Sequence, residues 1–251
     1  MNLSQSEREK EILHLLNDDP SLSVTKIGEI LGVSSVTVRT HLSNLEAQGL
    51  IIRSHGGAAP AFHPEILRRQ KTRMEEKNRI ARMAASLVRD GDTIMIEAGT
   101  TTALIAKYLV GKRNIRIVTN STLIVPFARS NPGLHLSVVG GTFRPETEAL
   151  VGPMALSDLD SFFVQTAFVG TDGFTIENGL SSHFPETAAV LKKVVERSEK
   201  TILVADSSKY GKTGFVSILP ITAVKKLITD SQMPEEAVRK LEARGVEVVA
   251  V

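Results

Sequence analysis

A glycine and three threonines separate two apolar runs in the segment EAGTTTALIAKYL, residues 97–109. A glycine lets the backbone approach a ligand closely, and Thr100, Thr101 and Thr102 stand where the second run would begin a helix. The free backbone N–H groups and the positive dipole end of a helix N-terminus attract anions. The segment therefore predicts a phosphate-binding loop, either of an enzyme that transforms a phosphorylated molecule or of a protein that senses one.

Small polar loops also follow other strand-like runs of the same region, in VTNS, VVGG, FVGTDG and VADSSKYG. In parallel α/β sheets, ligands bind outside the carboxyl ends of the strands, so these loops are expected to converge. An acid there can accept hydrogen bonds from sugar hydroxyls, and a lysine can pair with a phosphate. Taken singly, each loop could be a structural cap, with Asp206 a turn residue. The predicted effector site consists of Glu97, Gly99, Thr100, Thr101, Thr102, Asn120, Ser121, Gly140, Gly141, Asp172, Gly173 and Lys209.

Strand-like and helix-like runs alternate from Thr93 onward, and these elements must hold the loops in place. Strands are predicted in TIMIE, IRIVT, LHLSVV, TAFVG, TILVAD, VKKLITD and VEVVAV. Helices are predicted up to Leu109, from Ser121, within residues 186–198 and from Glu235. Short apolar strands that alternate with helices are typical of a mainly parallel α/β sheet.

The N-terminal region has the pattern of three short helices followed by a β-hairpin. Apolar stripes predict helices over residues 6–17 and 23–31. After the turn LGVSS, a third helix begins with Ser34 or Ser35 as its N-cap and runs to about Gln48. The segment LIIRSHGGA is then expected to form the hairpin, or wing. The predicted domains are a winged helix-turn-helix over residues 1–60, a linker over 61–75 and an α/β domain over 76–251.

The outer N-terminal face of the third helix carries small polar side chains and one arginine, Arg39. Such a face fits the major groove and presents hydrogen-bonding groups to base edges and phosphates. We expect Arg39 to contact a phosphate, since over half of protein–DNA hydrogen bonds go to the backbone. The pattern alone also permits a three-helix protein–protein module. The predicted DNA contacts are Ser34, Ser35, Val36, Thr37, Arg39, Thr40, Ser43, Arg53 and His55.

The composition excludes several classes of protein. The chain has 251 residues, of which 42% are hydrophobic and 23% charged, as in ordinary soluble globular proteins. It has no cysteine for a disulfide framework, and no apolar run reaches the roughly 18 residues of a membrane span. The N-terminal segment has no signal-peptide pattern, and we expect a cytoplasmic protein. The six histidines show no ligand spacing, so we expect no metal and no cofactor.

The formal net charge of +2 is too weak to indicate a polyanionic partner by itself. Residues 1–60 carry five Lys/Arg against seven Asp/Glu, whereas residues 61–82 carry seven against three. DNA binding would therefore depend on a local face and not on a bulk positive field. The basic cluster in residues 61–82 either lies near DNA phosphates or is a solvated surface.

The run LGVSSVTVRTHLSNLEAQGLIIRSHGGA strongly resembles the DNA-binding signature of the DeoR family of bacterial sugar-metabolism regulators. One departure stands in the recognition helix, where the family usually has Arg-Arg-Asp and this chain has Arg39, Thr40 and His41. Thr40 thus replaces a basic residue and His41 an acidic one. These replacements are expected to affect operator preference and affinity, and not the fold. The positions that match the signature are Val38, Arg39, Leu42, Leu45, Glu46, Gly49, Leu50, Arg53, His55, Gly56, Gly57 and Ala58.

The larger region is similar to the effector domain of the same family, across almost all of residues 75–232. The matching segments are AGTTT, VTNS, GGTFR, LVGP, FVGTDG, ADSSKYG and LITD. The resemblance implies a fold related to ribose-5-phosphate isomerase and sugar-phosphate deaminases, with a phosphorylated sugar or polyol as inducer. Glu97-Ala98 replaces a frequent Asp-Ser, and either Lys192 or Lys193 is the counterpart of the family's helix lysine.

From these observations we expect a transcriptional regulator of carbohydrate genes, a repressor that a phosphorylated effector releases from operator DNA. Binding to symmetric half-sites would require a homo-oligomer, a dimer or a tetramer. The alternative is a sugar-phosphate isomerase-like or deaminase-like enzyme with an appended DNA-binding head, for which Glu97, Glu186, Asp172 and Asp206 are possible acids. The loop GTDGFTIENG supplies only Asp172 where the isomerase-type pattern has further acids, so we expect no catalytic residues.

Overall fold

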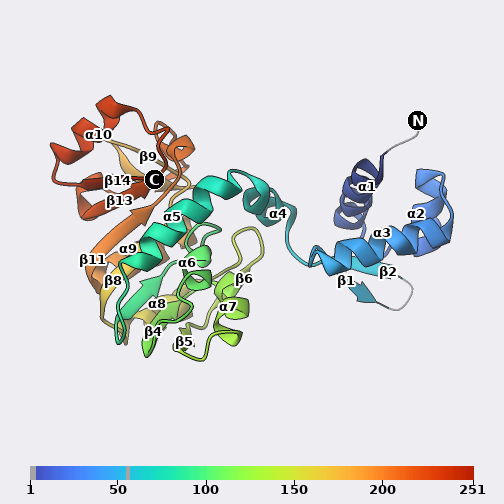
Figure 1. Cartoon of the computed structure of the whole chain (residues 1–251), viewed down its shortest axis with the longest axis horizontal. Coiled ribbons are helices and arrows are strands. Elements are labelled where there is room, and N and C mark those ends of the chain that lie inside the picture. The colour runs from blue at the N-terminus through green and yellow to red at the C-terminus, as the bar shows by residue number, and fades with distance from the viewer. Residues whose placement is uncertain (1–3, 55–56) are drawn as a thin grey trace. The chain divides into compact units, whose positions relative to one another are not determined.

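The computed structural model of the chain describes residues 4–54 and 57–251. The chain divides into two compact units, Met1–Arg69 and Gln70–Val251, and each is described by itself (Figure 1). Among the residues that the structure describes, no helix is both long and apolar enough to span a bilayer.

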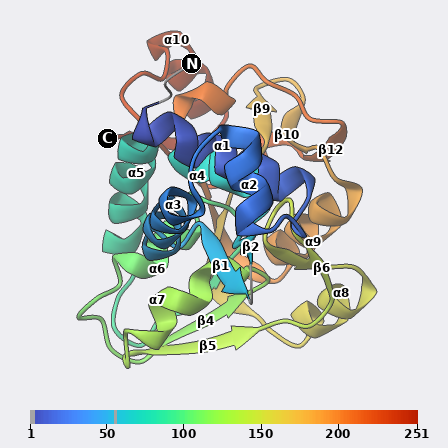
Figure 2. The same cartoon turned by 90° about the vertical axis from the view of Figure 1, so that its right-hand side faces the viewer.

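In the first unit, the described residues up to Pro60 form three helices and two paired strands (Figure 2). Ile12, Leu16, Ile27, Leu42 and Leu45 from the three helices form the centre of its hydrophobic core. This arrangement confirms the predicted helix-turn-helix with a following antiparallel strand pair. The elements are α1 (Gln5–Asp18), α2 (Val24–Leu31), α3 (Ser35–Ala47), β1 (Ile51–Ser54) and β2 (Gly57–Pro60).

Local capping interactions explain where α3 begins and ends. The Ser34 side chain accepts a hydrogen bond from the backbone N–H of Thr37, so Ser34 and not Ser35 is the N-cap. At the other end, Gly49 has a positive φ of 69° and its N–H donates to the Glu46 carbonyl. The N–H of Leu50 reaches back to Leu45, which completes a glycine-dependent helix stop. These caps fix the length of α3 by contacts between residues a few positions apart.

The segment that was predicted as a linker, residues 61–75, is helical in part. Helix α4 spans Pro64–Lys71 and α5 follows as Met74–Ser86. Glu65 accepts hydrogen bonds from Arg68 and Arg69, at the i+3 and i+4 spacings that stabilise a helix. No long apolar stripe marks α4 in the sequence, because this helix is short and is held in part by charged pairs.

A seven-stranded, wholly parallel sheet forms the centre of the second unit, which confirms the predicted α/β fold. Its strand order is β14-β13-β11-β8-β3-β4-β5, so the chain builds outward in both directions from β3. All seven predicted strands are present in it. They are β3 (Thr93–Ile96), β4 (Ile115–Thr119), β5 (Leu134–Val138), β8 (Val164–Val169), β11 (Ser198–Val204), β13 (Lys226–Thr229) and β14 (Glu247–Ala250).

Helices cover both faces of this sheet, as the apolar character of the strands requires. Ala167 and Leu203 point to the face that packs against α9. Neighbouring residues in a strand point to opposite faces, so Phe168 and Ile202 face the side of α5, which contacts β11 and β13 (Figure 1). The helices of the second unit after α5 are α6 (Ala103–Lys107), α7 (Val125–Arg129), α8 (Pro153–Asp160), α9 (Pro185–Glu196) and α10 (Glu235–Glu242).

Two small antiparallel sheets and α8 were not predicted. The sheets consist of strands of three or four residues, and TFR, GFT and GLSS among them have no apolar run that would mark a strand. They matter because they follow β5 and β8, at the edge where the predicted effector loops lie. One sheet pairs β6 (Thr142–Arg144) with β7 (Ala149–Val151), and the other has the order β12 (Val216–Leu219), β10 (Gly179–Ser182) and β9 (Gly173–Thr175).

Candidate functional site

The outer face of α3 presents the side chains that were predicted to contact DNA. Val36 is 69% exposed, and Arg39, Thr40 and Ser43 are also exposed. Thr40 donates a hydrogen bond from its hydroxyl to the Val36 carbonyl within the helix. Arg39 therefore stands on an open face of small side chains, with room for a backbone or base edge to approach.

The remaining predicted contacts lie around this face. Ser34 is exposed, and Ser35 and Thr37 are half-buried at the start of α3. Arg53 is half-buried on β1, where it pairs in register with Ala58 of β2. His55 lies outside the residues that the structure describes.

His41, the second residue of the departure from the family pattern, does not belong to the outer face. It is only 5% exposed, and its Nδ1 lies 3.5 Å from Glu9 Oε1 of helix α1. Asn44 donates a hydrogen bond to the same oxygen. Burial alone would raise the pKa of Glu9, but hydrogen bonds from Asn44 and Gln5 and the contact with His41 lower it. The replacement at His41 thus changes a contact between two helices, whereas Thr40 remains on the surface.

The carboxyl end of β3 leads into the glycine-threonine loop. Glu97 is 2% exposed, and its Oε2 accepts a hydrogen bond from the Gly170 N–H at the end of β8. Thr102 is fully buried and donates to the Gly99 carbonyl. A Cβ on Gly99 would lie 2.9 Å from Thr102 Oγ1, which accounts for the glycine. Thr100 is half-exposed, and its hydroxyl oxygen accepts a hydrogen bond from Lys77 on helix α5.

The helix dipole available to this loop is smaller than the sequence indicated. Helix α6 has only five residues, and Thr102 makes no side-chain cap hydrogen bond. A helix of little more than one turn has few aligned peptide dipoles. Any anion at this loop would therefore depend on side chains, including the half-exposed hydroxyl-bearing residues Thr100 and Thr101.

The loop after β4 joins its neighbours to one another. Asn120 is 1% exposed; its Oδ1 accepts from the Ala98 N–H at 2.9 Å and its Nδ2 donates to the Leu150 carbonyl at 3.3 Å. Ser121 is fully buried and forms an isolated bridge with Ala149. It does not cap a helix with its side chain. These contacts give both residues a structural role, in which β7 is held against the glycine-threonine loop.

Three glycines of the predicted effector site lie close to atoms of other residues. A Cβ on Gly140 would lie 2.9 Å from the sulfur of Met154 on α8, and one on Gly141 would lie 2.6 Å from the Val151 carbonyl. On Gly173 it would lie 2.4 Å from a backbone oxygen of Lys212. The backbone approaches explain Gly141 and Gly173 without a ligand, whereas the flexible Met154 side chain can move away from a Cβ on Gly140.

Two further loops meet after β8 and β11. The Asp172 carboxylate accepts hydrogen bonds from the Ser182 hydroxyl at 3.0 Å and the His183 N–H at 2.9 Å. Phe174 and Tyr210 pack with their ring centroids 5.6 Å apart. Lys209 ends the 3-10 turn Ser207–Lys209 and is half-buried. The structure therefore brings the loops of β3, β4, β8 and β11 into one connected edge.

Two cations at this edge were not predicted as site residues, because the basic cluster in residues 61–82 was expected near DNA phosphates or in solvent. Arg73, the N-cap of α5, donates from Nη2 to Asp230 Oδ1 at 3.1 Å, and its Nε lies 3.2 Å from Asp206 Oδ1. Asp206 is 2% exposed and Asp230 is fully buried. Burial would raise the pKa of Asp230, but hydrogen bonds from Ser207 and Gln232 and the charge of Arg73 lower it.

The second missed cation, Lys77, is 5% exposed and donates from Nζ to Thr100 Oγ1 at 3.1 Å. A signal for it was present in the sequence. Lys77 precedes Ile80, Ala81 and Ala84 by three, four and seven positions, so it occupies the apolar stripe of its helix. A lysine in such a stripe is expected to have a specific partner when buried.

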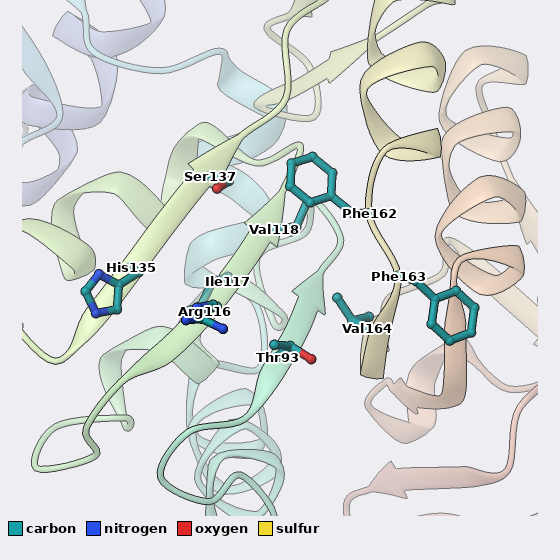
Figure 3. Close-up of a pocket in the computed structure, with 9 residues that line it drawn as sticks. All are labelled: Thr93, Arg116, Ile117, Val118, His135, Ser137, Phe162, Phe163 and Val164. Atoms are coloured by element: carbon teal, nitrogen blue, oxygen red, sulfur yellow. The ribbon is translucent and has the colours of Figure 1, made fainter.

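A groove of about 390 Å³ lies elsewhere on the sheet, and none of the predicted site residues lines it (Figure 3). Thr93, Arg116, His135 and Val164 line it from the first two residues of their strands, away from the carboxyl ends. Its geometry is therefore no support for the predicted effector site. Within residues 4–54 and 57–251, no group of three or more His, Cys, Asp or Glu side chains could hold a metal ion.

Comparison with known proteins gives matches over both units. Residues 8–61 match the DeoR-like helix-turn-helix domain, and residues 72–231 match the DeoR C terminal sensor domain. The chain is 34% identical to the HTH-type transcriptional repressor GlcR of Bacillus subtilis, over 98% of this chain and 96% of the relative. It is 33% identical to the HTH-type transcriptional regulator GlpR of Haloferax volcanii, over 97% of each chain.

Among solved structures, a D-ribose-5-phosphate isomerase in complex with phospho-erythronic acid aligns with 55% of this chain and 54% of its own. The identity is 19% and the TM-score 0.41. So distant a likeness carries no conclusion about activity.

Proposed function

The chain belongs to the DeoR family of transcriptional regulators, and from this premise we propose that it represses carbohydrate-metabolism genes until a phosphorylated sugar or polyol binds its larger unit. In this proposal residues 1–60 bind operator DNA, residues 76–251 sense the effector in the cytoplasm, and residues 61–75 connect them. A homo-oligomer, dimer or tetramer, would place two heads on the half-sites of a symmetric operator.

The observation that carries the DNA-binding part is the open outer face of α3. Val36, Arg39, Thr40 and Ser43 are all exposed there, while Val38, Leu42 and Leu45 of the same helix are buried in the core. Small polar side chains around one arginine allow the helix to enter a major groove closely. The proposed contacts are those predicted from the sequence, with His55 included on the resemblance alone.

The effector part is supported by the connected loops at the carboxyl edge of the sheet and by the cations near them. Thr100 and Thr101 offer hydroxyls, and Lys209 lies in the loop after β11. An effector bound at this edge would shift the population of molecules away from the DNA-competent state.

Sensing is favoured over catalysis by what the acids already contact. Glu97 accepts from a backbone N–H, and Asp172 accepts from the Ser182 hydroxyl and a backbone N–H. The relatives named above are transcriptional regulators, which is consistent with a protein that binds and does not convert its ligand. An assay for isomerisation or deamination of any sugar phosphate that binds would test this choice, and turnover would support the enzyme alternative.

The DNA-binding proposal is tested by Arg39→Ala. We expect operator affinity to fall by about 1–3 kcal/mol, and the salt dependence to weaken by about one unit of slope if Arg39 contacts a phosphate. Gel shifts at several salt concentrations, on a duplex that the wild-type protein selects from random sequence, measure both. Lys26→Ala is the matched control, since Lys26 is exposed on α2 and pairs with Glu29. Unchanged affinity of Arg39→Ala at low salt would show that α3 is not the recognition helix.

A further inference from the structure

Part of the central sheet is open to solvent on the face that α9 covers further along. Arg116 stands on β4, an interior strand between β3 and β5, and His135 stands on the edge strand β5, yet both are exposed. Both faces of a wholly parallel sheet are normally covered by helices. The groove of about 390 Å³ lies here, with Val118 and Phe162 among its apolar residues (Figure 3). This part of the sheet is therefore a surface that a further element can cover.

The groove combines a basic row with an aromatic side chain. Arg116 pairs in register with His135 on one side and Thr93 on the other, so the three lie in a row across neighbouring strands (Figure 3). Among the residues that the structure describes, the side chains of Arg116 and His135 have no hydrogen-bond or ion-pair partner. Phe162 lines the same groove. An element with both acidic and apolar side chains is the partner that this combination fits.

Helix α8, which ends two residues before the groove-lining Phe162, carries such side chains. Met154 is 63% exposed, and Ser157 and Asp160 follow it at intervals of three residues, so the three form one solvent-facing stripe. The helix has two aspartates and no basic residue. Phe163, at one end of the groove, is 58% exposed. The chain thus presents a basic groove and an acidic, partly apolar helix side by side.

We propose that this open part of the sheet is the surface through which two copies of the chain pair, with α8 of each copy seated in the groove of the other. A two-fold axis parallel to the strands, between the groove and α8, exchanges the two and closes the assembly. Arg116 then faces the partner's Asp160, and the exposed Met154 and Phe163 become buried. This inference rests on the proposed function, which requires at least two copies, and it names the surface that joins them.

The experiment measures the association of full-length variants by sedimentation velocity over a range of protein concentrations. Arg116→Glu and Asp160→Lys each place like charges in both contacts of the proposed dimer. Arg129→Glu is the matched control, since Arg129 is exposed on α7, outside the proposed surface. Tyrosine fluorescence checks that each larger unit is folded, because the only two tyrosines are Tyr108 and Tyr210 and there is no tryptophan.

We expect wild type and Arg129→Glu to form the same assembly. Each reversal on the proposed surface should raise the dissociation constant by about a hundredfold and give a smaller species, because like charges that face each other across an interface are costly. Asp160 also pairs with Lys193 of α9. Met154→Lys is therefore a second helix variant, which keeps that pair and is expected to dissociate in the same way.

A mixture of two variants gives the sharpest result. In a dimer of Arg116→Glu with Asp160→Lys, one contact is wild type and the other has its two charges exchanged. We expect the equimolar mixture to recover the assembly that neither variant forms by itself. Damage to the fold of either variant would not be repaired by mixing.

The remaining outcomes separate this proposal from the proposed function. A wild-type assembly that persists in Arg116→Glu and in both helix variants would overturn this surface and leave an oligomeric regulator in place. Variants that dissociate and do not associate on mixing would overturn the pairing of the groove with α8. A wild-type protein that is monomeric at every concentration, with and without operator DNA, would contradict the oligomer in the proposed function, and this surface with it.

Discussion

The outer face of α3 and the carboxyl edge of the sheet both consist of small polar residues, but the fold holds them differently. On α3, Arg39, Thr40 and Ser43 are exposed, and the hydroxyl of Thr40 donates its hydrogen bond within the helix. At the sheet edge no predicted effector residue is exposed, and Glu97 and Asn120 are buried with partners in neighbouring loops.

This difference shows that the burial of a polar residue decides how strongly its type indicates a binding site. A polar side chain on the surface is available to a partner, so its type and spacing carry most of the functional argument. A buried polar side chain must first satisfy its own hydrogen bonds, and several predicted ligand residues do so within the protein. The residues left for a ligand at the edge are therefore fewer than the sequence pattern indicated.

The largest expected loss of stability is that of Arg73→Ala. Wild-type stability of this variant would contradict the view that polar residues at the sheet edge depend on partners within the protein. Arg73→Ala leaves Asp206 and Asp230 buried without their shared cation. Removal of one partner from a buried ion pair typically costs about 3–5 kcal/mol of stability. Urea unfolding followed by tyrosine fluorescence measures this in the larger unit.

Arg113→Ala is the control, because Arg113 is exposed in a loop and should change stability by no more than about 0.5 kcal/mol. Equal unfolding midpoints for the two variants would mean that the buried carboxylates do not depend on Arg73.

A smaller effect is expected from Gly173→Ala, which sharpens the distinction between packing and binding at the sheet edge. The new Cβ would lie 2.4 Å from the Lys212 backbone oxygen, and such overpacking costs about 1–3 kcal/mol. At Gly170 the nearest atoms are 3.8 Å and 3.9 Å from the corresponding position, so Gly170→Ala is the matched control and should be neutral. The same fluorescence assay compares them. Wild-type stability of Gly173→Ala would exclude packing as the reason for this glycine and would favour a role in ligand binding.

The smallest effect is expected from Glu65 on α4, whose charged pairs are partly exposed to solvent. Hydrogen bonds from Arg68 and Arg69, against the opposing effect of burial, lower the pKa of Glu65 to about 2 from a usual value of 4.5. A lowered pKa stabilises the folded state above the unfolded-state value, and this contribution is lost as the pH falls through 4.5 toward about 2.

Glu65→Gln should therefore be less stable than wild type at neutral pH, with a difference that shrinks below about pH 4.5. Unfolding midpoints from circular dichroism across this pH range measure the difference. A constant difference at every pH would show that the carboxylate charge does not stabilise α4.

The sequence alone determined the parts of this protein that depend on residues close together in the chain. The serine before α3 and the glycine after it act within five positions, and the seven strands of the sheet were visible as short apolar runs. Strands of the small sheets such as TFR, GFT and GLSS were missed because they contain no apolar run. The described residues of both predicted sites lie on or beside the elements expected from the sequence, and their contacts with DNA and with an effector stay predictions.

Only the tertiary structure decided which polar residues are free for a partner and which support their neighbours. Arg73 meets Asp230 across 157 positions of sequence, and Lys77 meets Thr100 across 23. No local pattern encodes such pairs, because burial is set by elements that are distant in the chain. For the same reason His41 and Thr40, neighbours in one helix, have different roles: the packing of α1 against α3 buries one and leaves the other in solvent.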